Sequence, residues 1–347
     1  MKLLIIGYDQ LGQMGNYLAS AANGIGIDYT IMDVGRAETR SRIMQAFHWR
    51  FLGKKPANLA GFAAQVLETC RSAKPSLVIT TGNRVPLERR HIEEVQKLGI
   101  KIINYSTDDP WNRVMRAGWF IDSLPYYDAV FTPRRANFDD FHRCGVRAIH
   151  YMPFAYDPEV HQPWPRKAPT GAPSDVLFVG GCDAERLPII SALAESGFEL
   201  ALFGRYWNRH HRTRAYWRGV AGHSTIRAAS AAASICLCLV RRANRDGHVM
   251  RSFEAAAIGG CILAEDTDDH REFFGPEDHA VRYFRTIPEM LRQVEILVAD
   301  ANLRLRLSIT LRQRMAARND TYSDRLEAML RLSALADSSQ CSTVTVG

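Results

Sequence analysis

The sequence predicts an α/β protein built from two doubly wound domains. Short apolar runs, each typical of a buried parallel strand, alternate along the chain with helical or loop segments. A Pro-rich stretch interrupts this alternation near the middle, and a second strand–glycine–helix series begins after it. With 347 residues, 46% of them hydrophobic, the chain is long enough to build two such cores.

The first domain is predicted over residues 1–156. Met1–Ile6 is an apolar run that ends at Gly7, a helical pattern follows to Ala22, and DYTIMDV is the second strand, which together make a βαβ opening. The runs SLVITTG, IKIINYS, DAVFTPR and AIHYMPF supply further strands of a parallel sheet.

Residues 157–174 are predicted to form a linker, because DPEVHQPWPRKAPTGAPS holds five Pro within eighteen residues. The second domain is expected over 175–318, with DVLFVGG, FELALFG, SICLCLV and CILAED as strands and ERLPIISALAESG as a helix. A C-terminal helix is expected over 319–335, and residues 336–347 are expected to be disordered. The arginines between 304 and 318 are interpreted as the solvated face of amphipathic helices.

The composition narrows the class of protein. The net charge of +7 comes from Arg spread along the chain, which suits a cleft for anionic ligands. No basic stretch is interleaved with stacking aromatics, so no nucleic-acid partner is expected, whereas peripheral contact with a membrane surface stays open. No run of eighteen apolar residues and no signal-peptide pattern occurs, so a cytoplasmic protein is expected. No CxxC pair or HExxH motif occurs, so no metal site is expected.

The segment from Asp246 to Glu254 carries the most informative chemical pattern. It places an acidic residue in a loop, Arg251 at a helix start and Glu254 one turn inside that helix. Free backbone N–H groups and the helix dipole favour a phosphate at such a position. Asp246 and Glu254 can accept hydrogen bonds from sugar or ribose hydroxyls, and Arg251 can neutralise a diphosphate. The alternative is an ordinary helix start with a solvated Asp and Arg.

Two glycine turns are candidate ligand loops. Gly180 and Gly181 follow a strand and precede Arg186, which can reach a phosphate oxygen; the alternative is a tight turn with a surface Arg. In the first domain, Gly12 and Gly15 fit the last two glycines of GxGxxG, with Asp33 as the ribose-binding acid, but Gln10 replaces the first glycine. A loop with Gln10 and Gly12 favours an acceptor or a distal phosphate over the NAD site of a dehydrogenase.

Two further candidates follow strands of the first sheet. Asp108 and Asp109 cannot both point the same way, so one is expected to cap the turn at Pro110 while the other faces a ligand. A purely structural Asp-Pro turn is the alternative. Asn137 is expected either to cap a helix or to contact ligand.

Several blocks together resemble the CgeB-type, or spore maturation protein B-like, glycosyltransferases of the GT-B superfamily, which are related to glycosyltransferase family 4. The blocks are NYSTDDPWN, VFTPRRAN, YMPFAYDPEVH, DVLFVGGCDAERLPII, FGRYW, MRSFEAAAIGGCILAED and RNDTYSDRL, and they span about residues 1–330. The resemblance implies two Rossmann-like domains, an acceptor bound mainly by the first and a nucleotide sugar bound mainly by the second. It also implies that the last helices cross back onto the first domain.

The resemblance further implies retaining transfer from a nucleotide-diphosphate sugar, with a UDP-sugar favoured, to a hydroxyl of a glycan, lipid, protein or small molecule, without metal or other cofactor. The donor-binding residues it implies are Gly180, Gly181, Arg186, His248, Met250, Arg251, Ser252, Phe253 and Glu254. The catalytic candidates are Asp246, Asp108 and Asp109, and the acceptor or distal-phosphate candidates are Gln10, Gly12 and Asn137. Related enzymes carry Glu-x7-Glu, and this chain has Asp246 at the first position. The alternatives are a catalytically degenerate carbohydrate-binding protein, a sugar-nucleotide epimerase, a phosphorylase and an NAD-dependent dehydrogenase.

Overall fold

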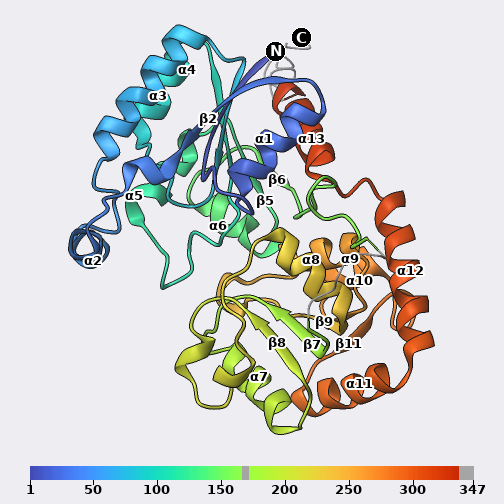
Figure 1. Cartoon of the computed structure of the whole chain (residues 1–347). Coiled ribbons are helices and arrows are strands. Elements are labelled where there is room, and N and C mark those ends of the chain that lie inside the picture. Colours follow the sequence, from blue (N-terminus) through green and yellow to red (C-terminus); the bar gives the residue numbers. More distant parts are fainter. Residues whose placement is uncertain (166–171, 336–347) are drawn as a thin grey trace. The chain divides into compact units, whose positions relative to one another are not determined.

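The computed structural model describes residues 1–165 and 172–335 and divides into two compact units (Figure 1). The first unit comprises Met1–Pro153, Ala243–Arg245 and the helix Tyr322–Leu335. The second comprises Phe154–Arg242 and Asp246–Thr321. Each unit holds a parallel sheet with helices, so the predicted pair of doubly wound α/β domains is confirmed. The expected disordered tail, 336–347, and residues 166–171 of the expected linker lie outside the described residues.

Within its described residues, the first unit has a six-stranded sheet of order β2-β1-β3-β4-β5-β6. Its strands are β1 (Lys2–Gly7), β2 (Asp28–Asp33), β3 (Leu77–Thr81), β4 (Lys101–Tyr105), β5 (Ala129–Thr132) and β6 (Ile149–Tyr151). Strand β2 pairs with one edge of β1, and the chain then crosses over to β3, which pairs with the other edge of β1. The loops after β1 and β3 therefore diverge at the carboxyl edge, where ligands bind in such sheets.

The helices of the first unit are α1 (Met14–Gly24), α2 (Arg42–Phe51), α3 (Leu59–Ala73), α4 (Arg89–Lys97), α5 (Gly118–Ile121), α6 (Phe138–Arg143) and α13 (Tyr322–Leu335). The last of these returns to this unit from the C-terminal end of the chain, as the sequence comparison implied. The rings of Tyr17 on α1 and Tyr322 on α13 stack with centroids 4.8 Å apart. Lys101 Nζ donates to the Ser333 carbonyl at 2.6 Å, which ties α13 to β4.

Glycines allow β1 and α1 to approach closely. A Cβ at Gly15 would lie 2.7 Å from the Tyr8 carbonyl oxygen, and a Cβ at Gly7 would lie 2.2 Å from Thr81 Oγ1. Both positions therefore require glycine. Asp33 ends β2, and its carboxylate accepts from Gly35 N at 2.9 Å, so it caps a short 3-10 turn.

The second unit has a five-stranded sheet of order β11-β10-β9-β7-β8 within its described residues. Its strands are β7 (Ser174–Val179), β8 (Leu200–Phe203), β9 (Ala233–Cys238), β10 (Ile262–Glu265) and β11 (Arg282–Phe284). Its helices are α7 (Arg186–Glu195), α8 (His223–Ala232), α9 (Met250–Ile258), α10 (Asp268–Phe274), α11 (Ile287–Ala299) and α12 (Ala301–Ala317). The switch point of this sheet lies between β7 and β9, and the loops after these two strands diverge there.

The described residues also contain short 3-10 turns, η1 (Val34–Ala37), η2 (Leu124–Tyr126), η3 (Arg135–Asn137), η4 (Trp207–Arg209), η5 (Arg214–Tyr216) and η6 (Arg242–Asn244). Residues of the expected linker pack in the second unit, because the boundary falls after Pro153 and β7 already begins at Ser174. His161, one of these residues, is 2% exposed.

The arginines of α12 do more than cover a solvated face. Arg304 donates to the Leu297 and Val298 carbonyls at the end of α11, and Arg314 Nε donates to the Phe273 carbonyl at 2.6 Å. They satisfy carbonyls at helix ends that lack partners within their own helices. Over residues 1–165 and 172–335, no helix has the length and apolar character needed to cross a membrane.

Candidate functional site

The second unit contains a cleft of about 480 Å³ at the carboxyl edge of its sheet. The turns after β7 and β8 form one wall. Gly204 has φ +141°, and a Cβ there would lie 2.1 Å from the Gly180 carbonyl oxygen. Only glycine fits at this position, and its lack of a side chain lets the two turns cross in direct contact.

Two tryptophan side chains form hydrogen bonds with the backbone of these turns. Trp207 Nε1 donates to the Gly180 carbonyl and Trp217 Nε1 donates to the Gly204 carbonyl, both at 2.8 Å. Gly181 lines the cleft, and the nearest atom to a Cβ built there, the Arg205 carbonyl oxygen, is 3.8 Å away. Gly180 and Gly181 were predicted from the sequence, whereas Gly204, Trp207 and Trp217 were not. The FGRYW block, which contains Gly204 and Trp207, was the available signal.

Four arginines line the cleft. Arg205 lies in the turn after β8, and the other three, Arg186, Arg241 and Arg251, come from α7, from the loop after β9 and from α9. Arg186 lies in the first turn of α7, its side chain is 12% exposed, and its Nε has no hydrogen-bond partner in the described part of the chain. Burial lowers the pKa of Arg186; the carboxylate of Asp183 opposes this shift, and the positive charge of Arg241 adds to it. A partly desolvated cation with a second cation beside it is a site that an anion would stabilise.

Helix α9 begins at this cleft. Val249 is its N-cap residue, so the N–H groups of Met250 and Arg251 belong to the first turn, which has no intrahelical carbonyl to bind. The preceding Gly247 packs against α10, since a Cβ there would lie 2.4 Å from Asp269 Oδ2. The helix start predicted from the sequence thus brings positive backbone charge to the same cleft as these arginines.

The side chains of His248, Ser252 and Phe253 are occupied within the protein. His248 Nε2 accepts from Phe154 N at 3.2 Å, so Nδ1 carries the proton that it shares with Asp269 Oδ2 at 2.8 Å. Ser252 Oγ lies 2.9 Å from His270 Nε2, and Phe253 is fully buried against Phe273. These three candidates fix the start of α9 and do not line the cleft.

Glu254 is 1% exposed and does not line the cleft, but it forms an ion pair with Arg251, which does. His161 Nε2 lies 3.6 Å from Glu254 Oε1. His161 Nδ1 lies 3.0 Å from Asp157 N and 3.1 Å from the Asp157 carbonyl oxygen, so Nε2 is the ring nitrogen that faces Glu254. Burial lowers the pKa of His161 although the Glu254 charge opposes it. His161 was not predicted as a site residue, because it lies in the segment expected to be a linker.

Asp246 is 9% exposed, and its backbone N–H donates to the Arg241 carbonyl at 3.2 Å. Its carboxylate acts on Arg186 by raising that group's pKa against the dominant effect of burial. Asp246 therefore lies in the electrostatic surroundings of Arg186 although it does not line the cleft itself.

The first unit separates Asp108 from Asp109. Asp109 is 1% exposed; it accepts from Arg245 Nε at 2.7 Å, from Asn137 Nδ2 at 2.9 Å and from Trp111 N at 2.9 Å. This carboxylate organises the turn, and Asn137 supports it instead of capping α6 with its side chain. Asp108, which accepts from Asn244 Nδ2 at 3.1 Å, lines a small pocket with Thr107.

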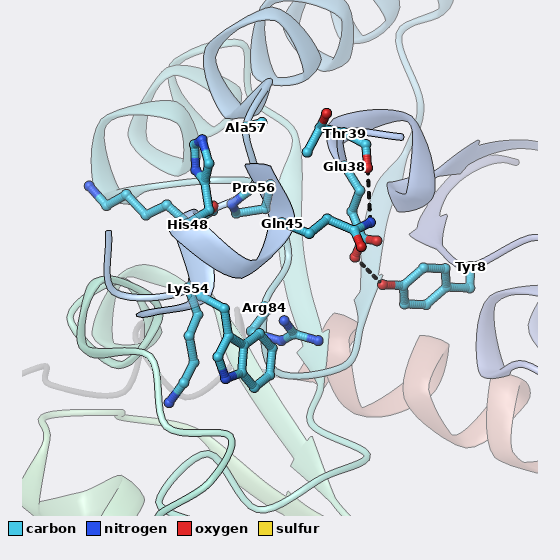
Figure 2. Close-up of a pocket in the computed structure, with 11 residues that line it drawn as sticks. Tyr8, Glu38, Thr39, Gln45, His48, Lys54, Pro56, Ala57 and Arg84 are labelled. Atoms are coloured by element: carbon cyan, nitrogen blue, oxygen red, sulfur yellow. Dashed lines mark hydrogen bonds between the residues drawn. The ribbon is translucent and has the colours of Figure 1, made fainter. Parts of the chain in front are cut away.

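A second, larger pocket of about 320 Å³ adjoins this one at the ends of β1 and β3 (Figure 2). Tyr8, Glu38 and Arg84 line both pockets, and Tyr8 donates from its hydroxyl to Glu38 Oε1 at 2.7 Å. Burial, together with Glu38, raises the pKa of Tyr8, so the phenol stays protonated. Arg84 Nε is buried without a hydrogen-bond partner among the described residues. The loop candidates Gln10 and Gly12 line neither pocket, but Tyr8 and Gln13 beside them do so.

Residues 186–331, most of which belong to the second unit, match a family model described as glycosyl transferase-like. This range contains Arg186, Arg241, Arg251 and Glu254. That part of the chain is a glycosyltransferase domain. No curated protein matches the chain by sequence.

Solved structures extend the likeness over both units. Sucrose-phosphate synthase from Thermosynechococcus elongatus matches with a TM-score of 0.66 and 13% identity, over 98% of this chain and 100% of that one. An α,α-trehalose 6-phosphate synthase from Burkholderia multivorans matches with a TM-score of 0.63 and 11% identity, over 98% and 99%. HepE from Anabaena, solved in complex with UDP-glucose, matches with a TM-score of 0.62 and 12% identity, over 96% and 100%.

These matches assign the GT-B fold. The glycosyltransferase domain confirms the predicted enzyme class. The narrower CgeB-type resemblance stays a prediction. Over residues 1–165 and 172–335, no group of three or more His, Cys, Asp or Glu side chains is placed to hold a metal ion.

Proposed function

We propose that this glycosyltransferase moves a sugar from a nucleotide-diphosphate sugar, with UDP as the favoured nucleotide, to an acceptor hydroxyl, with retention and without a metal. The observation that carries the proposal is the convergence of three arginines, a helix N-terminus and a glycine turn on one cleft of the second unit. A diphosphate is the donor group that such a cleft neutralises. HepE, solved with UDP-glucose, supports UDP as the nucleotide.

In the proposed reaction, the bond between the anomeric carbon and the diphosphate oxygen breaks, and the acceptor oxygen forms the new bond to that carbon on the same face. The acceptor proton passes to an oxygen of the leaving diphosphate, and the nucleoside diphosphate is released. Negative charge grows on the leaving oxygens during this step. Arg186, Arg241 and Arg251 are already fixed around that position, so they stabilise the transition state without reorganising.

Glu254 and Asp246 are proposed to bind the donor's hydroxyls. His161 and Arg251 hold the Glu254 carboxylate from two sides, which preorganises it for a ribose hydroxyl. Asp246 is proposed to contact the transferred sugar. The acceptor is proposed to bind at the carboxyl edge of the first unit, where Arg84 and Asp108 line adjoining pockets.

Donor binding by isothermal calorimetry tests the site directly. UDP-, GDP-, ADP- and TDP-sugars are titrated into the whole protein, and UDP-glucose is expected to bind. Arg186→Gln and Arg251→Gln are each expected to weaken UDP binding by about tenfold to a hundredfold, since a charge-assisted bond to phosphate contributes about 1.5–3 kcal/mol. The matched control is Arg212→Gln, whose side chain is 53% exposed and pairs with Glu195. Wild-type affinity in both cleft variants would rule out this donor site.

Product analysis distinguishes the alternatives. Mass spectrometry of reactions with UDP-glucose and candidate acceptors is expected to show a glycosylated acceptor. Donor binding without turnover, together with unchanged binding in Asp246→Ala, would instead identify a carbohydrate-binding protein with a degenerate site. An isomerised donor would identify an epimerase, and phosphate-dependent cleavage of a glycan would identify a phosphorylase.

A further inference from the structure

Helix α2 of the first unit exposes an unusually apolar face. Ile43 is 82% exposed, Phe51 66%, Phe47 47% and Met44 45%. No residue of this helix is buried. Large apolar side chains that are exposed singly are ordinary, but four on one helix form a contiguous patch that water solvates poorly.

The patch lies on one side of α2, because Ile43, Phe47 and Phe51 follow one another at intervals of four residues. The other side of the helix faces the larger pocket, which Gln45, His48 and Trp49 line (Figure 2). The Trp49 ring lies beneath the Arg84 guanidinium, with the carbon of that group 4.9 Å from the ring centroid. The apolar face is therefore free of the pocket and is not needed to build it.

The surroundings of the patch are basic. Arg40, Arg42 and Arg50 are exposed on α2 or just before it, whereas Lys54 and Lys55 line the larger pocket, where Lys55 pairs with Glu88. No Asp or Glu occurs between Glu38 and Glu68, a stretch that includes the whole of α2. A second copy of the chain would bring these cations against one another, whereas an anionic surface would complement them.

We propose that α2 docks on an anionic phospholipid bilayer. Its apolar side chains enter the boundary between head groups and acyl chains, and the flanking arginines bind lipid phosphates, as in basic amphipathic helices that lie in the membrane plane. If the larger pocket binds the acceptor, which rests on the function proposed above, docking through the apolar side of α2 holds that pocket near the lipid surface, with only the helix between them. The acceptor class is then a hydroxyl carried by a membrane lipid.

Flotation with vesicles tests the proposal. The whole protein is expected to float with vesicles of phosphatidylcholine and phosphatidylglycerol but not with phosphatidylcholine alone. The triple variant Ile43→Gln, Phe47→Gln, Phe51→Gln is expected to lose at least about tenfold in binding, because it removes most of the inserted apolar area. The matched control is Leu305→Gln with Ile309→Gln, two apolar residues of α12 that are 61% and 49% exposed, and it is expected to bind as the wild type does.

A charge variant separates the two contributions. Arg40→Gln, Arg42→Gln and Arg50→Gln keep the apolar face intact, and together they are expected to reduce binding to the anionic vesicles about tenfold or more. Circular dichroism checks that each variant is folded. Absence of wild-type binding, or equal binding by the apolar triple variant, would overturn the proposal. A wild-type dimer that the triple variant dissociates would also overturn it, because the patch would then be an interface between copies.

Calorimetry on the same variants keeps this inference apart from the proposed function. The triple variant is expected to bind UDP as the wild type does, since none of its residues lines the donor cleft. A protein that binds vesicles but no nucleotide sugar would retain the docking surface and lose the proposed donor. A protein that binds nucleotide sugar but no vesicles would contradict only the proposed docking surface.

Discussion

Gly204 determines how closely the two glycine turns approach in the second unit. Replacing it by Ala places a Cβ 2.1 Å from the Gly180 carbonyl oxygen, on a backbone with φ +141°. Gly204→Ala is expected to lower the free energy of unfolding by about 1–3 kcal/mol or more, because the turns must separate or the backbone must strain. Chemical denaturation followed by tryptophan fluorescence measures this effect.

The matched control is Gly181→Ala, since the nearest atom to a Cβ there is 3.8 Å away. This variant is expected to retain wild-type stability within about 0.5 kcal/mol. Equal stability of the two Ala variants would show that the turns do not need the crossing seen at Gly204.

His270 is predicted to make the protein sensitive to acid. It is fully buried: Nδ1 lies 2.8 Å from the Glu265 carbonyl oxygen and Nε2 lies 2.9 Å from Ser252 Oγ. Burial lowers the pKa of His270 to about 4. The unfolded chain therefore binds a proton below about pH 6.5 that the folded chain does not bind until about pH 4. The free energy of unfolding falls as the pH falls through this window, by at most about 1.4 kcal/mol per pH unit.

The His270→Gln variant checks this expectation. It removes the titrating ring, so its stability is expected to fall less steeply between about pH 6.5 and pH 4 than that of the wild type. Burial also lowers the pKa values of His161 and His223, so only the difference between the two proteins reports on His270. Parallel pH profiles would contradict the assignment of a neutral His270.

At the level of elements, sequence patterns predicted most of the strands because buried parallel strands are continuous apolar runs. SICLCLV and CILAED became β9 and β10. The short strand β11, RYF, was not predicted, since three residues carry too little periodicity. Helix α2 was also not predicted, because its apolar side chains do not face a core.

Helix α13 stabilises the first unit through one aromatic stack. Tyr322→Ala is expected to lower the free energy of unfolding by about 3–5 kcal/mol, since it opens a cavity beside Tyr17 in a fully buried position. Tyr322→Phe keeps the ring and is the matched control; it is expected to cost less than half as much. Hydrogen exchange in α1 measures the local effect. Equal protection of α1 in the wild type and Tyr322→Ala would show that α13 does not stabilise this unit.

At the level of the whole molecule, the cleft of the second unit could be predicted in part. Arg186 and Arg251, which line it, were predicted because each opens a helix after a strand, and parallel strands end at one edge of a sheet. Pairings across long separations could not be predicted. Arg245 binds Asp109 from 136 positions along the chain, and His161 reaches Glu254 from a segment rich in Pro. Only the folded chain shows that Asp109 is held by several partners while Asp108 lines a pocket.

The source of positive charge for the donor predicts how the molecule responds to metal removal. Arg186, Arg241 and Arg251 line one cleft together with the start of α9, and they are the cations proposed to neutralise the diphosphate. Affinity for UDP-glucose is therefore expected to change by no more than about twofold between EDTA and excess Mg²⁺, because the arginines already neutralise the diphosphate. Calorimetry in the two buffers measures this. The Arg186→Gln, Arg251→Gln double variant provides the control: Mg²⁺ is not expected to restore its affinity. An increase of about tenfold or more on adding Mg²⁺ to the wild type would show that a metal carries part of the charge now assigned to the arginines.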